Sequence, residues 1–216
     1  MTASTPTSAA IEQVFKYANI TVVGDGLITA PLSANLFTNL GLPRTSLVVP
    51  QVGMLDFGTY SFYVQPESRR VFAKDQSNVL DVNSPIVEML RSYLRQVTTA
   101  QLKAVGFNFQ FEVTFAESML TFLREAFFNP TALARIQGPI ENAGVRFTLT
   151  RSDHALTINL DPAWRKPNKG NLHLNYHVDI PESETNSLDF LNRYAEFCPD
   201  ASNAAYSLLK IGEKNE

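Results

Sequence analysis

The sequence has a single cysteine, Cys198, among its 216 residues, so no disulfide can form within the chain. It also has no excess of positive charge, because 18 Lys and Arg stand against 21 Asp and Glu. The net charge of −3 argues against a broad basic surface for nucleic acid or for an anionic membrane. No apolar run approaches the roughly 18 residues needed to span a bilayer. With no signal peptide visible either, we expect a cytoplasmic protein without a membrane partner.

Motifs of catalysis and cofactor binding are also missing. The sequence has no G-x-S-x-G elbow, no P-loop and no H-E-x-x-H. The run from Gly24 to Gly26 lacks the third glycine and the following helix of a dinucleotide fingerprint, and is interpreted as a turn. Cys198 ends an apolar helical stripe, so we interpret it as a buried apolar residue. The sequence therefore identifies no catalytic residue, cofactor or metal, and weighs against an enzyme without excluding one.

Large apolar residues are plentiful and follow clear periods. Hydrophobic residues make up 44% of the chain and include 15 Phe, enough for a folded core. Residues 105–115 alternate apolar and polar side chains, the pattern of a strand with one buried face. Further strands are predicted at 17–23, 45–57, 60–64, 70–73, 145–150, 155–160 and 172–180. Helices are predicted at 33–40, 84–98 and 117–128 and, split by Pro199, at 187–197 and 201–211. These elements predict an α+β fold, a mainly antiparallel sheet with helices packed on its apolar face.

The order of these elements repeats along the chain, since a strand, a helix, three strands and a helix occur twice. A tandem duplication into two similar βαβββα lobes would give this order, and so would chance in an α+β chain of this size. We divide the sequence into a disordered Thr/Ser/Ala-rich tail at 1–12, an N-terminal lobe at 13–101 and a C-terminal lobe at 102–216. The two lobes are expected to share one compact unit.

One stretch carries a family resemblance. A glycine precedes alternating large residues in the run Ala104-Val105-Gly106-Phe107-Asn108-Phe109. With the helix before it and the strands and C-terminal helix after it, the chain resembles a sporadically distributed bacterial family of unknown function. The resemblance is one of element order over the last half to two thirds of the chain, and the Arg-Tyr pairs expected in that strand are absent. It implies neither an activity nor site residues.

All three histidines, His154, His173 and His177, fall in one predicted three-stranded meander. His173 and His177 are four residues apart on a strand, about 13 Å, which is too far for both to ligate one ion with bonds of about 2 Å. A shared metal site is therefore not predicted. Alternation instead places His173, Asn175, His177 and Asp179 on the polar face of this sheet, together with Arg146. That face is either solvated surface or the lining of a groove or interface.

The loop at 161–170 contains the only tryptophan, Trp164, beside Arg165 and two lysines. Trp and Arg are favoured at the centres of protein interfaces, and they also stack on nucleic-acid bases. A hairpin tip whose Trp164 folds back onto the sheet explains the same residues without a partner. Nucleic acid is the least favoured of these three interpretations.

Two classes of function remain open. The preferred one is a non-enzymatic protein-binding or assembly module, which would use the polar face or the Trp164 loop. Its partner would be another protein or a second copy, because sheet edges tend to pair and to form homodimers. The alternative is a small-ligand-binding protein or enzyme with its site on the polar face.

Overall fold

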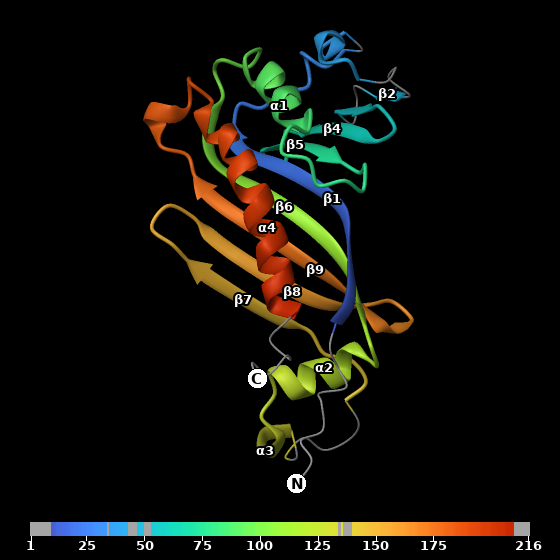
Figure 1. The fold of residues 1–216 in the computed structure, drawn as a ribbon. Coiled ribbons are helices and arrows are strands. Elements are labelled where there is room, and N and C mark those ends of the chain that lie inside the picture. The colour runs from blue at the N-terminus through green and yellow to red at the C-terminus, as the bar shows by residue number, and fades with distance from the viewer. Residues whose placement is uncertain are drawn as a thin grey trace.

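Nine strands form one continuous sheet in the computed structural model, which describes residues 10–33, 35–42, 47–49, 53–133, 135 and 140–209 (Figure 1). Across the sheet the strands follow the order β2-β3-β4-β5-β1-β6-β9-β8-β7, and every neighbouring pair is antiparallel. The strand bounds are β1 Ala10–Asp25, β2 Leu47–Val49, β3 Met54–Asp56, β4 Tyr60–Gln65, β5 Arg70–Asp75, β6 Gln101–Phe115, β7 Val145–Thr150, β8 Ala155–Ala163 and β9 Lys166–Asp179. Together with the helices, this confirms the predicted α+β class.

The helices differ from the prediction in length and in one break. Their bounds are α1 Ile86–Leu94, α2 Met119–Ala126, α3 Pro130–Leu133 and α4 Arg193–Leu209, with short 3-10 helices η1 Thr38–Leu40, η3 Glu182–Glu184 and η4 Asp189–Asn192. The predicted break at Pro199 is wrong, because α4 continues through it. Pro199 has no N–H for the Ala195 carbonyl, but Ala195 is exposed, so water can bind that oxygen. Among the described residues, no helix is long and apolar enough to cross a membrane.

Two sequence predictions fall partly outside the described residues. Residues 1–9 of the expected tail are not described, whereas residues 10–12 are the first of β1. The strand expected at 45–57 corresponds to two short strands, β2 and β3, on either side of residues 50–52, which lie outside the description.

The two longest strands, β1 and β6, pair with each other near the centre of the sheet. A β-bulge between Phe15 and Tyr17 shifts the register of this pair. Phe15 packs its ring edge-on against Phe111, 5.6 Å between ring centres, on the side that holds the core. Because the bulge inserts one extra residue, Tyr17 points to the other side.

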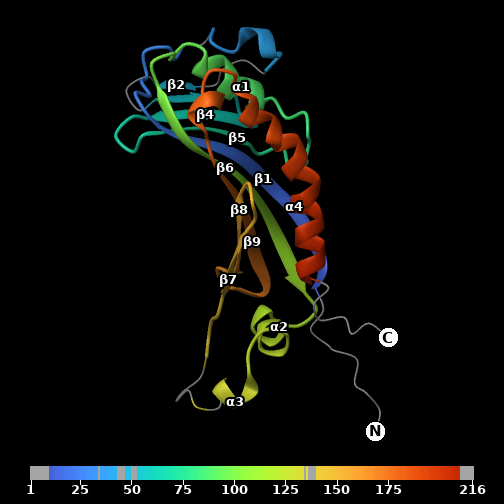
Figure 2. The same ribbon diagram turned by 90° about the vertical axis from the view of Figure 1, so that its left-hand side faces the viewer.

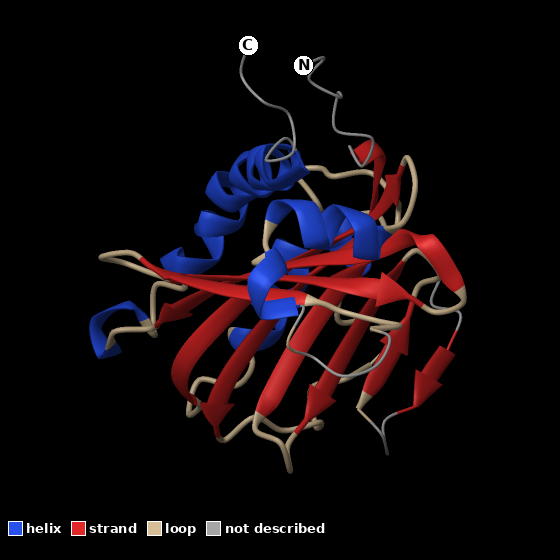
Figure 3. Ribbon diagram, turned by 90° about the horizontal axis from the view of Figure 1, so that it is seen from below, coloured by secondary structure: helices blue, strands red, loops and turns tan. Residues whose placement is uncertain are grey.

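The core lies between one face of the sheet and the helices. In β6 the predicted alternation is confirmed, since Val105, Phe107, Phe109, Phe111, Val113 and Phe115 are all buried. Figure 2 shows α1 and α4 against the same side of the sheet, and Figure 3 shows most helical segments gathered there. The apolar stripe of α4 contributes Tyr194 and Phe197, which pack on Phe109 and Phe107. Between Val105 and Phe115, the intervening residues of β6 therefore point to a second face.

Candidate functional site

The second face of the sheet, here called the open face, carries no helix within the described part of the chain (Figure 2). Strand registers place a set of mostly uncharged polar and aromatic side chains on it. Its members are Tyr17, Asn19, Thr21, Tyr63, Phe72, Lys74, Asn108, Gln110, Glu112, Arg146, Thr148, Thr157, Asn159, Asn171, His173, Asn175 and His177. Most of these are half-buried instead of fully exposed. The open face is thus a preformed surface, partly shielded from water by its own side chains.

Three asparagines line up across the middle of the open face. Asn19, Asn108 and Asn175 lie directly opposite one another on β1, β6 and β9. The Asn175 side-chain amide Nδ2 donates to Asn108 Oδ1 at 2.5 Å, and Asn108 Nδ2 donates to Asn19 Oδ1 at 2.9 Å. Gly106 leaves room for this asparagine ladder, because a Cβ there would lie 3.1 Å from the Asn175 amide nitrogen. The ladder fixes the orientation of three amides on a surface that water can reach.

Aromatic rings cover the open face beyond the asparagine ladder. Tyr63 and Phe72 stack with ring centres 4.6 Å apart, and the Lys74 ammonium lies 4.1 Å from the centre of the Tyr17 ring. Burial lowers the pKa of Lys74 and raises the pKa of Tyr17. Both shifts disfavour the charged form, as expected where water is partly excluded. This end of the open face therefore combines flat apolar rings with little exposed charge.

Burial also shifts the pKa of His173, which lies on the part of the open face formed by the C-terminal half of the chain. It lies between Gln110 and Asn159 of the neighbouring strands, and burial lowers its pKa below the usual 6.5 although the charge of Asp161 opposes the shift. The interpretation of the polar face as plainly solvated surface does not fit this position. His173 is a neutral hydrogen-bonding group on the open face at pH 7.

We expect His173 to make folding stability depend on pH. Because its pKa is lower in the folded than in the unfolded chain, the unfolded chain binds more protons, and stability is lost as pH falls below about 6.5. Urea titrations at pH 7.5 and 5.5 should give a smaller difference for His173→Gln than for the unchanged protein. His177→Gln, an exposed position on the same strand, is the control for losing an imidazole. An unchanged pH dependence in His173→Gln would contradict the prediction.

The predicted site residues share the open face but do not form one cluster. Asn159 separates Arg146 from His173, so their backbones lie about 10 Å apart at the usual strand spacing. Asn175 belongs to the asparagine ladder. His177 Nε2 lies 3.4 Å from the Asp179 carboxylate at the end of β9, where the Asp179 side chain is 94% exposed. These residues make a surface, and no single pocket holds all of them.

Trp164 and Arg165 lie elsewhere, at the tip of the β8–β9 hairpin. Trp164 is 83% exposed and does not fold back onto the sheet, and the Arg165 guanidinium lies 5.5 Å from the centre of its ring. Arg165 has a positive φ of 57°, which a non-glycine residue seldom adopts. A pocket of about 550 Å³ separates this tip from the start of α2. The tip presents an apolar ring flanked by positive charge.

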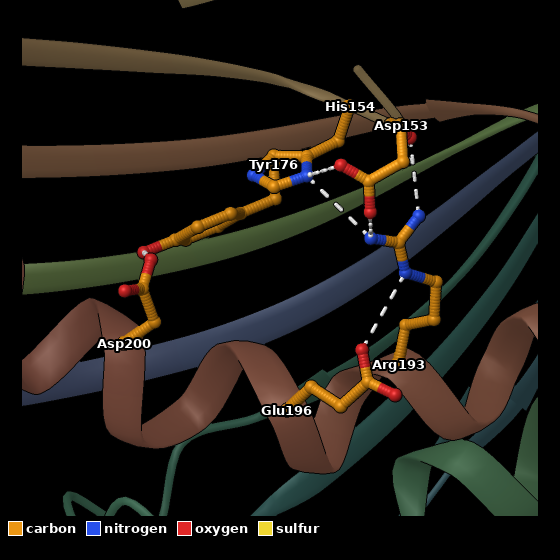
Figure 4. A network of polar contacts seen from close by, with 6 residues as sticks. All are labelled: Asp153, His154, Tyr176, Arg193, Glu196 and Asp200. Atoms are coloured by element: carbon orange, nitrogen blue, oxygen red, sulfur yellow. Dashed lines mark hydrogen bonds and ion pairs between the residues drawn. The ribbon is translucent and has the colours of Figure 1, made fainter. Parts of the chain in front are cut away.

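A polar network that the sequence did not reveal joins the β7–β8 turn to α4 (Figure 4). His154 Nδ1 lies 2.9 Å from the Asp153 carboxylate, and Arg193 binds both that carboxylate and the Asp153 carbonyl oxygen. Although desolvation opposes it, the hydrogen bond from His154 and the charge of Arg193 lower the pKa of Asp153. Glu196 lies 3.7 Å from the other side of Arg193. Arg193 therefore ties the hairpin turn to the first turn of α4.

The His154 ring is enclosed although it belongs to a turn. Its side chain is only 6% exposed, and it packs edge-on against Phe197 with ring centres 5.0 Å apart. The Nε2 atom on the other side of the ring is buried and has no hydrogen-bond partner among the described residues. On the other side of the ring, the Tyr176 hydroxyl donates to Asp200 at 2.9 Å (Figure 4). A pocket of about 470 Å³ lined by His154, His177 and Arg193 lies beside the network.

Two buried polar residues were also missed in the N-terminal half. Asp75 is 2% exposed at the end of β5, and its carboxylate accepts from the Ser84 hydroxyl at 2.5 Å and from the Ser77 N–H at 2.9 Å. The Ser84 hydroxyl therefore binds Asp75, and no side chain caps the start of α1. The alternation of Val71, Ala73 and Asp75 was the available signal, because it puts the carboxylate on the buried face.

The described residues offer little for a metal or a reactive thiol. No group of three or more His, Cys, Asp or Glu side chains among them is placed to hold an ion. Cys198 is 1% exposed, and burial raises the pKa of its thiol to about 11, so it is protonated at neutral pH. The chemistry of this surface is hydrogen bonding and ring contact.

Comparison with family models, with curated proteins and with solved structures gives no match for this chain.

Proposed function

We propose that the protein is a non-enzymatic binding module that docks a protein partner on the open face. The observation that supports this most strongly is the central band of mostly uncharged, half-buried side chains between β5 and β8, with the asparagine ladder at its middle. Protein interfaces have such centres, enriched in aromatic residues and depleted of charge, surrounded by a polar rim. The charged residues Glu112 and Arg146 lie toward the borders of this band, and within it the Lys74 ammonium lies over the Tyr17 ring.

The preorganised side chains favour docking over mere exposure to water. Ordering an interface side chain on binding costs about 0.5–1.5 kcal/mol, and the ladder and the ring contacts are already formed without a partner. The lowered pKa of Lys74 and of His173 indicates that part of the desolvation cost is also met in the free protein. The proposed partner is a folded protein with a neutral polar or aromatic surface.

A second function class is supported by the His154 network. A buried polar atom without a hydrogen-bond partner costs about 1–3 kcal/mol, so a ligand that hydrogen-bonds to His154 Nε2 would explain why the imidazole is present. The adjoining pocket of about 470 Å³ is in the size range of small-molecule sites. This alternative predicts a small polar ligand at the end of β9.

The division into lobes remains part of the proposal. We infer that residues 13–101 and 102–216 are tandem copies, since each contributes one long central strand, a meander beside it and a covering helix. The strand order β3-β4-β5-β1 followed by β6-β9-β8-β7 supports this, because a two-fold axis between β1 and β6 would interchange the two sets. Location in the cytoplasm remains a prediction.

Site-specific photo-crosslinking tests the proposed function. A photoreactive phenylalanine analogue at Tyr63 or Gln110 should give an adduct with one and the same protein, whereas the analogue at Asn203 on α4 should not. With that protein purified, Gln110→Arg should weaken binding at least tenfold and Asn203→Arg should not change it. If the open-face positions give no adduct, or no more than Asn203 gives, the proposal is contradicted and the His154 pocket becomes the better candidate.

A further inference from the structure

The two edges of the sheet are β2 and β7. At the first edge, three residues of β2 are described, Leu47–Val49. At the other edge β7 has six residues, VRFTLT, without proline or glycine and with Arg146 as its only charge. No described strand or helix pairs with its outer side (Figure 1). Of the edge defences that proteins use, β7 has only the single arginine.

The hydrogen-bonding groups on the free side of β7 can be assigned from its hairpin. Arg151 N–H donates to the His154 carbonyl at 2.8 Å, so these two residues form a hydrogen-bonded pair across the turn. Hydrogen-bonded and non-hydrogen-bonded pairs alternate along an antiparallel ladder. In the observed register the N–H and C=O groups of Arg146, Thr148 and Thr150 therefore point away from β8. They form a regular row of unpaired main-chain donors and acceptors.

The side chains of β7 alternate in phase with this row. Val145, Phe147 and Leu149 point to the helix-covered side of the sheet, and Leu149 is 47% exposed there. Arg146, Thr148 and Thr150 point to the open face. A partner strand that continues the sheet must repeat both the apolar and the polar row, because a slip by one residue would exchange the two faces.

We propose that a second copy of this chain pairs with β7 through its own β7, antiparallel and centred on Thr148. In this register Thr148 faces Thr148 and Arg146 faces Thr150 of the other copy, so the two arginines lie far apart. These facing positions form three hydrogen-bonded pairs, each exchanging two main-chain bonds. Phe147 faces Leu149 of the other copy, which covers the exposed Leu149.

The sequence of β7 favours its own copy over an unrelated peptide. Antiparallel self-pairing places Phe147 opposite Leu149 and Thr148 opposite Thr148 of the other copy, whereas an arbitrary strand supplies this match only by chance. The pairing uses the main chain of β7 at the border of the open face and leaves the central band between β5 and β8 free, so it stands apart from the proposed protein-binding function. Because a two-fold axis would cross the sheet, both open faces would be on the same side of the dimer.

Engineered cysteines test the pairing and its register. The Cα atoms of facing hydrogen-bonded residues are about 5.5 Å apart, within reach of a disulfide. Thr148→Cys should therefore give a covalent dimer under mild oxidation. Thr150→Cys is the matched control, because its two copies would be about 13 Å apart. The native Cys198 is buried and should not contribute. If Thr148→Cys cross-links no more than Thr150→Cys, the proposal is overturned.

Sedimentation of the unchanged protein gives a second test. One strand pair is a small interface, so we expect reversible self-association from the 24.0 kDa monomer at concentrations on the order of 10 µM. Thr148→Pro should abolish it without loss of thermal stability, because the removed N–H points away from β8. A protein that stays monomeric up to about 1 mM, far above this concentration, would overturn the pairing.

Discussion

Replacing Phe109 with alanine is expected to lower the free energy of unfolding by about 3–5 kcal/mol, the range observed for large-to-small changes in tight cores. Phe109 is 1% exposed at the centre of β6. Its ring stacks on Tyr194 of α4 at 5.7 Å and meets Tyr176 of β9 edge-on at 5.9 Å. Removing it would leave a cavity where sheet and helix meet, and neither rigid ring can move in to fill the space. A denaturant titration at constant pH measures the loss.

Gln110→Ala is the control for this experiment, because the next residue of the same strand points to the open face. Its cost should stay within about 0.5 kcal/mol, as for most changes outside a core. A loss below about 1 kcal/mol for Phe109→Ala would show that the facing of β6 is wrong. Since the open face is defined by that facing, the proposed binding surface would then be wrong too.

Replacing Asp75 with alanine should cost about 2–4 kcal/mol, because two donors would lose their acceptor in a buried place. The Ser84 hydroxyl and the Ser77 N–H both bond to this carboxylate, and Asp75 itself is 2% exposed. Ser84 lies two residues before the first residue of α1, so the same change should loosen the start of that helix. Thermal unfolding would report the loss, and hydrogen exchange in α1 would locate it.

Asp179→Ala provides the matched carboxylate control, since that side chain is 94% exposed and should cost little. Asp75→Asn tests the contribution of the negative charge, because the side chain keeps its size. The asparagine oxygen can still accept one of the two hydrogen bonds, but its NH₂ group would face the other donor, on Ser77 or Ser84. We expect it to retain about half of the lost stability. An Asp75→Asn protein more stable than the original would contradict the structural role of the carboxylate and point to a function for its charge.

Strand facing was predictable from the sequence because it depends on neighbours two residues apart. The alternation in residues 105–115 and 172–180 placed Phe109 in the core and His173 and Asn175 on the opposite face, and both placements agree with the structure. The sequence also predicted a connection at 161–170, but as a loop, whereas β8 and β9 continue through most of it and only Trp164 and Arg165 lie between them. The alternation likewise gave the open face in the C-terminal half.

What could not be predicted depends on residues distant in sequence. The asparagine ladder needs the register of β1, β6 and β9, which no local pattern gives. The contact of His154 with Asp153 depends on Arg193, which lies about 40 residues further along and packs on Phe197. The break predicted at Pro199 was wrong because the tertiary packing of α4 on the sheet outweighs one missing hydrogen bond.

The central pairing of β1 with β6 also delays the folding of β1 while the chain is being synthesised. Asn19 on β1 meets Asn108 only after about 90 further residues have been made, and such distant contacts slow folding. At the usual rate of translation, β1 therefore waits on the order of 10 s for its neighbour. During that interval Ala18, Ile20 and Val22, which are fully buried in the finished protein, have only the earlier strands to pack against. A chaperone that holds extended apolar segments would bind the nascent chain at this stage.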